Sequence, residues 1–268
     1  LLGVANIRSN LLPVVDLKGG RVTLQFDHLG YDLKNYLYTI QHCNADWQPS
    51  ALQDNEYIDG FLEDRILNIS NSLNTLQAYT HYSISIPNSN MKWTKSGNYV
   101  LKIFDDEDDH RLVLTRRFLV QETQWLVRAK MSPVIDARKL FTHQEIDYEV
   151  YHQGASIANP VKEVKTFVLQ NYRWETALGP VAPRPFATAS ETMDFNYQDS
   201  IVFPANKEWR FFDIRTFDYR GDNVRSIQRV GNGLQVWLKS DQDRSESHAY
   251  GLIDDLNGQF HIENRSQG

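Results

Sequence analysis

Apolar and polar residues alternate along most of this chain, which is the pattern of β-strands with covered faces. The clearest run is YLYTIQHC at residues 36–43, where Tyr36, Tyr38, Ile40 and His42 share one face. The other face of this run also carries apolar groups, so both faces are expected to be partly covered. Helical periodicity is almost absent, and the chain is therefore predicted to be all-β.

The same alternation predicts further strands in the first half of the chain. They fall at residues 11–16, 22–27, 65–70, 80–87, 100–105 and 112–120. The first of them is expected at a sheet edge, because Pro13 cannot donate a hydrogen bond to a ladder. Turn residues such as Gly19 and Gly20 separate the runs, so the strands are predicted to pair as successive hairpins.

A corner signal precedes the strand at residues 100–105. The segment Ser96-Gly97-Asn98-Tyr99 resembles the approach to a late strand in immunoglobulin-like sandwiches. In those sandwiches a glycine turn leads to a tyrosine whose hydroxyl bonds back to the corner. The segment therefore favours an immunoglobulin-like β-sandwich and predicts this hydrogen bond for Tyr99.

The strand at residues 36–43 is followed by a loop of unusual composition. Turn residues, among them Asn44, Asp46 and Pro49, end the strand. The loop also carries the large apolar side chains Trp47, Tyr57, Ile58 and Phe61. That is more apolar surface than a simple connection needs. The loop is therefore expected either to pack back over its own domain or to form a contact surface.

The polar residues 121–124 mark a predicted domain boundary, because one strand ends there and a new set begins at Trp125. Strand patterning then recurs at residues 125–129, 144–151, 161–170, 208–219 and 233–240. Residues 178–192 contain three prolines and are expected to be an extended loop. The Asn257-Gly258 pair favours a tight hairpin near the end of the sequence. We therefore predict two immunoglobulin-like β-sandwich domains in tandem, at residues 1–121 and 122–268, the second truncated relative to the natural chain.

Composition narrows the class of protein. The 268 residues are 41% hydrophobic, 23% charged and 12% aromatic, with a net charge of -6, which describes a globular chain that leans toward β structure. The negative charge and the lack of a basic stripe argue against a nucleic-acid partner. No apolar run approaches the roughly 20 residues that span a bilayer as a helix, so the chain is not expected to cross one.

The number of cysteines does not decide between the cytoplasm and the periplasm. Cys43 is the one cysteine, which excludes an intrachain disulfide and a cysteine metal cluster. This fits the cytoplasm, but a periplasmic protein with a self-sufficient core needs no disulfide either. The first residues, LLGVANIRSN, lack the basic and apolar regions of a signal peptide, as a mature chain also would.

Two groups of residues could carry chemistry, and a structural explanation is preferred for each. The five acidic residues 105–109 could bind Ca²⁺, but they lack the features of an EF-hand loop and are expected to form a solvated hairpin. His42 and Asp46 could act as a general base pair, but no nucleophile follows in a recognisable motif. A structural, hydrogen-bonded His42 is preferred. We therefore predict no catalytic residue, no metal site and no cofactor.

Glycan chemistry is an alternative that the composition leaves open. Carboxylates suited to glycoside hydrolysis occur on many strand ends, and nothing singles out a pair of them. Of the six tryptophans, only Trp47 and Trp174 are flanked by turn or loop residues. These two are therefore the candidates for surface contacts.

The strand at residues 36–43 and the loop after it, taken with three further segments, are similar to a known family. The run YTIQHCNADWQPSALQDNEYIDGF, followed by NTLQAYTHYSISIPN, SGNYVLKIFDD and LVLTRRFLV, resembles the first domain of the type IX secretion system plug protein family. The resemblance is collinear over about residues 7–120, and its HCNADWQPS and EYIDGF blocks are unusual. The second half resembles that family's second domain more loosely.

The resemblance implies a non-enzymatic periplasmic protein, associated with the outer membrane, that binds the large β-barrel translocon of type IX secretion. It would plug the pore of that barrel in the idle state. The motif positions carried over are His42, Asp46, Trp47, Tyr57, Asp59 and Phe61, as partner contacts or as residues that structure the loop. Structuring the loop is the preferred role for most of them. The alternative function is a carbohydrate-binding or glycan-processing accessory module.

Overall fold

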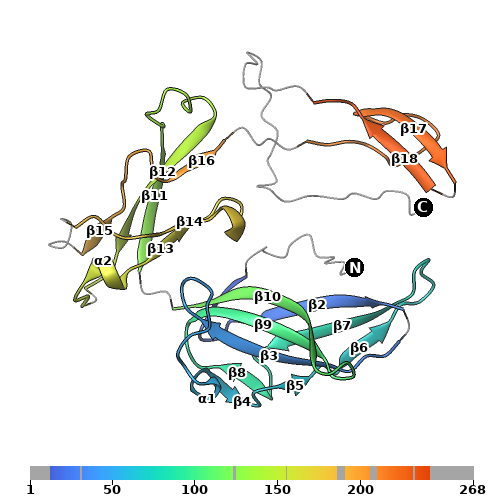
Figure 1. The fold of residues 1–268 in the computed structure, drawn as a ribbon, viewed down its shortest axis with the longest axis horizontal. Coiled ribbons are helices and arrows are strands. Elements are labelled where there is room, and N and C mark those ends of the chain that lie inside the picture. The colour runs from blue at the N-terminus through green and yellow to red at the C-terminus, as the bar shows by residue number, and fades with distance from the viewer. Residues whose placement is uncertain are drawn as a thin grey trace. The chain divides into compact units, whose positions relative to one another are not determined.

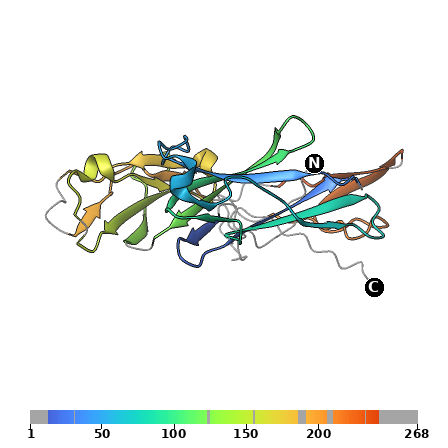
Figure 2. The same ribbon diagram turned by 90° about the horizontal axis from the view of Figure 1, so that it is seen from below.

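The computed structural model describes residues 13–30, 32–122, 125–154, 156–185, 191–205, 210–231 and 233–241. Strands dominate its regular structure (Figure 1, Figure 2). The helical segments in these residues are short: α1 (Asp54–Tyr57), α2 (Pro160–Glu163) and η1 (Trp174–Thr176). The prediction of an all-β chain is confirmed, and the division into two immunoglobulin-like domains stays a prediction.

The first part of the chain forms two sheets that share one core. One sheet has the order β1 (Val14–Asp16), β10 (Arg111–Gln121), β9 (Gly97–Asp105), β3 (Tyr36–Cys43) and β5 (Asp64–Arg65). The other has the order β2 (Val22–Leu29), β7 (Tyr79–Ile86) and β6 (Asn68–Asn71), while β4 (Ile58–Gly60) pairs with β8 (Met91–Trp93). These pairs are antiparallel except β1 with β10, which is parallel. The predicted strands of this half are present, with β1 at a sheet edge and residues 65–70 divided between β5 and β6.

The core between these sheets is rich in aromatic rings. Phe26 of β2 stacks on Tyr82 of β7 with 5.2 Å between ring centroids, and Tyr36 of β3 meets Tyr82 edge-on at 4.8 Å. Four further side chains are almost fully buried: Tyr38, Ile40, Leu101 and Ile103. Because burying one large apolar side chain stabilises a fold by roughly 1.5–3 kcal/mol, the alternation in β3 and β9 decides which face of their sheet turns inward.

The predicted corner is present at the start of β9. The Tyr99 hydroxyl donates to the Lys95 carbonyl over 2.9 Å, and the Tyr99 side chain is fully buried. Gly97 has a φ of 145°, and a Cβ at this position would lie 2.3 Å from His42 Nε2. Both the backbone conformation and the neighbouring ring therefore require glycine here.

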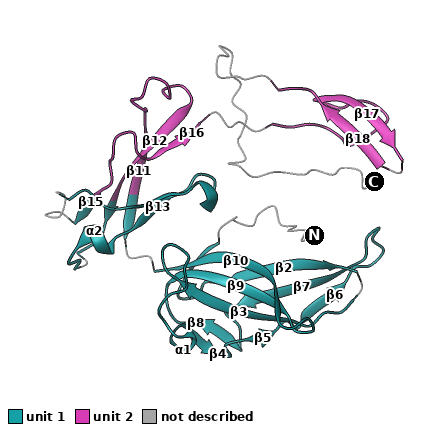
Figure 3. Ribbon diagram, in the orientation of Figure 1, with its two compact units in different colours: residues 1–127, 150–193 teal, residues 128–149, 194–268 magenta. Residues whose placement is uncertain are grey.

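The chain divides into two compact units, residues 1–127 with 150–193 and residues 128–149 with 194–268 (Figure 3). The later strands include a sheet with the order β11 (Leu126–Ser132), β12 (His143–Tyr151) and β15 (Thr192–Asp194), with β16 (Val202–Pro204) also paired to β12. Two ribbons pair β13 (Thr166–Val168) with β14 (Leu178–Val181) and β17 (Val224–Val230) with β18 (Gly233–Leu238). The boundary after residue 121 stays a prediction.

Two predictions about elements around residue 170 are wrong in part. Residues 161–170 do not form one strand, because the Asn159 side chain accepts a hydrogen bond from the Lys162 backbone N–H over 3.2 Å and caps α2. Strand β13 begins only after that turn. The predicted loop at residues 178–192 starts with strand β14, which pairs with β13, and residues 186–190 lie outside the described residues.

The strand predicted at residues 208–219 is also wrong. Described residues 210–219 contain no strand. Their backbone groups bond elsewhere: the Asp213 N–H donates to the Asp222 carbonyl over 2.9 Å, and Asn223 Nδ2 donates to the Phe211 carbonyl over 2.7 Å. The strand at residues 233–240 is confirmed as β18, whereas the hairpin at Asn257-Gly258 lies outside the described residues.

Strand β12, predicted at residues 144–151, buries two carboxylates that its sequence pattern does not reveal. Glu145 is 3% exposed and Asp147 is 7% exposed. The Ser132 hydroxyl donates to Asp147, whereas Glu145 Oε1 has no partner among the described residues. Burial, with Asp147 and Asp199 nearby, raises the pKa of Glu145 above its usual range. Alternating carboxylates therefore do not mark a solvent-exposed face in this strand.

Candidate functional site

The candidate site is the motif loop, residues 44–61, which follows β3. It opens with a tight turn in which the Trp47 N–H donates to the Asn44 carbonyl over 3.0 Å. Helix α1 and strand β4 follow, and the Phe61 N–H then donates to the Asn90 carbonyl over 2.7 Å. The loop is thus a folded part of its domain, tied to it at both ends.

His42 fixes the base of the motif loop. Its Nδ1 lies 2.9 Å from Ser50 Oγ, and its Nε2 lies 3.1 Å from the Ser96 carbonyl oxygen. The ring also meets Tyr99 edge-on with 5.1 Å between centroids. Because both ring nitrogens are engaged within the fold, the geometry is that of a structural histidine rather than of a general base.

Tyr57 anchors the middle of the motif loop. It is 2% exposed, and its hydroxyl donates to the Asp54 carboxylate. Its ring lies 5.6 Å from that of His42 and 6.0 Å from that of Tyr99. Burial, reinforced by Asp54, raises the pKa of Tyr57 above its usual range. Tyr57 therefore belongs to the core and is a neutral hydrogen-bond donor.

Three motif residues face outward. Asp46 and Asp59 are exposed, and the Phe61 side chain is 61% exposed. Gly60 has a φ of 106°, and a Cβ there would lie 2.2 Å from the Asn90 carbonyl oxygen. Glycine therefore lets the chain pass close to its neighbour just before the exposed Phe61.

Trp47 is part of a run of contacting side chains that we call the tryptophan stack: Arg117, Trp47, Trp174 and Phe167. Arg117 Cζ lies 4.7 Å from the centroid of the Trp47 ring. Trp174 meets Trp47 edge-on at 5.1 Å between centroids, and Phe167 meets Trp174 edge-on at 5.5 Å. All four residues belong to the first compact unit. The two tryptophans that the sequence marks as surface candidates therefore contact each other.

The tryptophan stack contains unfavourable features that its contacts only partly offset. Trp47 has a φ of 64°, and this left-handed conformation costs about 1–2 kcal/mol for a residue with a side chain. The indole N–H groups of Trp47 and Trp174 are buried without an acceptor in the part of the chain that the structure describes, at about 1–3 kcal/mol each. Edge-on aromatic pairs and cation–π contacts return about 0.5–2 kcal/mol each. Because the costs are at least as large as these returns, the stack adds little net stability.

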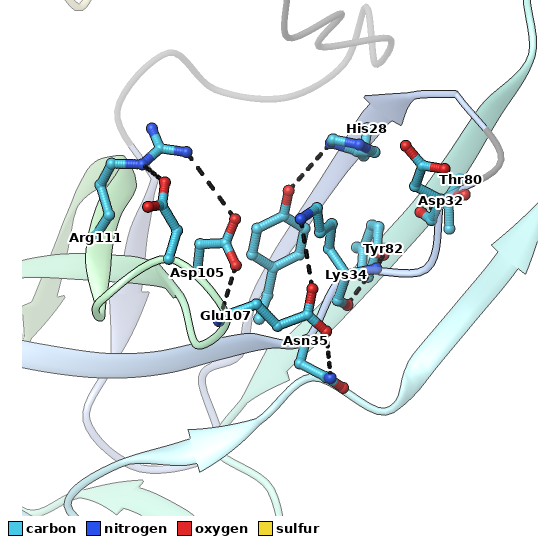
Figure 4. A network of polar contacts seen from close by, with 11 residues as sticks. His28, Asp32, Lys34, Asn35, Thr80, Tyr82, Asp105, Glu107 and Arg111 are labelled. Atoms are coloured by element: carbon cyan, nitrogen blue, oxygen red, sulfur yellow. Dashed lines mark hydrogen bonds and ion pairs between the residues drawn. The ribbon is translucent and has the colours of Figure 1, made fainter.

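The opposite end of β3 carries a network of polar contacts beside the rings of Tyr36 and Tyr82 (Figure 4). Tyr36, the first residue of β3, is in register with Asp105 of β9. Glu107 accepts from Asn35 Nδ2 over 2.7 Å and pairs with Lys34 Nζ at 3.4 Å. These groups hold the β9–β10 hairpin against the strand start by charge-assisted hydrogen bonds.

The acidic run 105–109 forms a hairpin, but not all of it is solvated as expected. Asp105 is 4% exposed and accepts from the Glu107 backbone N–H over 3.1 Å. Asp106 pairs with Arg65 at 2.9 Å. Among the described residues, no three His, Cys, Asp or Glu side chains are grouped so that they could hold a metal ion. The same residues include no helix that is long and apolar enough to cross a membrane.

Some residues of the site could not be predicted as part of it. Arg117 lies on an exposed position of β10, and nothing in its sequence neighbours points toward Trp47. Ser50, which bonds His42, is one of several polar residues in the loop. The role of Gly60 could have been predicted, because an Asp-Gly pair marks a turn and a glycine next to strand residues indicates a close backbone approach.

One comparison matches the part of the chain that contains the motif loop, and another matches almost the whole chain. Residues 3–122 match the family model described as Type 9 secretion system plug protein 1st domain. The chain is also similar to a solved structure, the crystal structure of a hypothetical protein from Parabacteroides merdae ATCC 43184, with 27% identity and a TM-score of 0.81. That similarity covers 99% of this chain and 67% of the other. No curated protein matches this chain.

Proposed function

Because residues 3–122 match the model of the Type 9 secretion system plug protein 1st domain, we propose that the protein is a non-enzymatic plug of that system. It resides in the periplasm at the outer membrane, binds the large β-barrel translocon, and closes the translocon's pore in the idle state. The single observation that carries this proposal is the family match over residues 3–122.

The construction of the first sandwich supports this proposal. A pore wide enough for folded cargo needs a stopper that keeps its shape, and a core of stacked and edge-on rings such as Phe26, Tyr36 and Tyr82 provides rigidity. The motif loop is tied down by hydrogen bonds at both ends, so it does not have to order when a partner binds. A preformed surface of this kind suits tight binding.

The exposed motif residues are the contacts that we propose for the partner. Phe61 offers an aromatic anchor, and Asp46 and Asp59 offer exposed charges on the same loop. His42 and Tyr57 instead structure the loop, because both are engaged inside the fold. This divides the motif into residues that form the surface and residues that hold it.

The alternative function, a carbohydrate-binding module, is not supported by the two tryptophans that were its candidates for sugar contacts. A sugar platform needs an open ring face. Trp47 instead has Arg117 over its ring and Trp174 against it. No second function is therefore proposed.

The proposal is tested by capturing partners of the full-length, tagged protein from detergent-solubilised outer membranes, with mass spectrometry to identify them. Phe61→Ser is compared with Leu76→Ser, which removes an even more exposed apolar side chain from another turn. We expect wild type and Leu76→Ser to retain one very large barrel protein, and Phe61→Ser to retain at least about tenfold less, as for a central aromatic contact. If wild type retains no barrel, the proposed function is wrong.

A further inference from the structure

The tryptophan stack gives the motif loop a second, concealed contact residue. Trp47 lies in the motif loop, yet Trp174 from η1 packs against its ring. Its indole N–H is buried and has no acceptor among the described residues, and the same holds for the N–H of Trp174. A contact that leaves both donors unpaired fits neither ring well, so a partner that supplies an acceptor can compete with it.

We propose that Trp47 is a docking residue that the chain's own Trp174 covers, and that a partner binds by displacing Trp174. This inference rests on the proposed function, and it adds how the contact surface is uncovered. The apparent affinity for the partner is the affinity of the uncovered form multiplied by the fraction of molecules in which Trp174 is displaced.

The chemistry around Trp47 specifies what the partner must present. The indole N–H needs a hydrogen-bond acceptor, and the exposed Arg117 guanidinium lies 4.7 Å from the ring centroid. An N–H donor next to a cation favours an anionic oxygen over a neutral one. The partner is therefore a protein loop with an Asp or Glu side chain placed beside the Trp47 ring.

The two sides of the contact differ in how firmly they are held. The Trp47 side is fixed, because the Asn44 N–H and the Ser50 N–H bond to the Gln48 and His42 carbonyls over 2.8 Å and 3.1 Å. Trp174 lies in a single 3-10 turn, which is closed by a hydrogen bond from the Ala177 N–H to the Trp174 carbonyl over 3.2 Å. Trp174 is thus the side that moves when the contact opens.

The cover itself is tested on the full chain without any partner. All six tryptophans are replaced by 5-fluorotryptophan, and Trp47→Phe identifies the fluorine resonance of Trp47. Trp174→Ala is expected to shift that resonance and to at least double its solvent isotope shift between H₂O and D₂O, since the ring becomes wet. Tyr172→Ala, which removes an exposed ring two residues earlier, is the control and leaves the resonance in place. If Trp174→Ala also leaves the Trp47 resonance unchanged, the proposal is wrong.

The consequence for docking is tested by the same capture of the outer-membrane barrel. Trp174→Ala is expected to raise the affinity at least about threefold, because the covered population disappears, and Trp47→Ala to lower it. If wild type retains the barrel and Trp174→Ala does not raise retention, Trp174 is a structural contact and the inference fails while the proposed function stands. If no variant retains a barrel, the proposed function fails, and the docking role of Trp47 fails with it.

Discussion

The two ends of strand β3 are stabilised by different physics. Around Cys43 at one end, the motif loop is held by the rings of His42, Tyr57 and Tyr99, with hydrogen bonds that are partly removed from water. Around Tyr36 at the other end, the β9–β10 hairpin is held by exposed pairs such as Lys34 with Glu107. The first arrangement depends on shape and the second on charge.

This difference shows where function is to be sought. Exposed ion pairs contribute little and weaken in salt, so the polar end holds a turn without demanding one exact geometry. The aromatic end demands glycine at two close approaches, Gly60 and Gly97, and keeps Trp47 in a left-handed conformation. Left-handed residues occur at both ends, since Asp109 and His110 of the polar hairpin have φ values of 48° and 53°. The feature that sets the aromatic end apart is therefore the buried, unpaired indole N–H of Trp47.

The largest expected effect is at the corner of the aromatic end. Gly97→Ala should lower the free energy of unfolding by about 3 kcal/mol, because a strained φ adds to a clash with the His42 ring. Gly19→Ala is the control: its φ is 82° but no atom lies within 4 Å of the added Cβ, so about 1 kcal/mol is expected. Urea unfolding measures both. Equal losses would mean that the aromatic end is no more tightly packed than an open turn.

A smaller effect is expected for Tyr36 in alkaline solution. Burial, with Asp105 nearby, raises the pKa of Tyr36 to about 12, compared with about 10 in an unfolded chain. Because the folded state favours the neutral phenol, its contribution is complete below pH 10 and is lost as the pH rises toward 12. Between pH 9 and pH 11, wild type should therefore lose more stability than Tyr36→Phe, as followed by urea unfolding. An identical loss in both proteins would mean that Tyr36 ionises like a solvated tyrosine.

The smallest effect is expected for the ion pair of the polar end. A double-mutant cycle with Lys34→Met and Glu107→Gln should give a coupling energy below about 0.5 kcal/mol at low salt, and it should disappear in 1 M NaCl. Thermal unfolding of the four proteins at both salt concentrations measures it. A coupling above about 1 kcal/mol that persists in salt would show that the two ends are not held by different forces.

Much of the fold could be predicted from sequence because strands carry a local signal. Alternation located β2, β3, β7 and β12, and the Gly97-to-Tyr99 segment predicted the bond from the Tyr99 hydroxyl to the Lys95 carbonyl. Short elements without periodicity were missed. Helix α2 depends on one cap at Asn159. The segment 210–219 forms no strand, and the Asp213 N–H bonds instead to the carbonyl of Asp222 in the following turn.

The sequence alone determined that this is an all-β chain and that its motif loop is too apolar to be a plain connection. These properties follow from patterns within a few residues. The tertiary structure decided that Tyr57 is buried while Phe61 is exposed, and that Trp47 meets Arg117 and Trp174. Those contacts join residues far apart in the chain, and their geometry depends on how sheets pack, for which no local pattern exists.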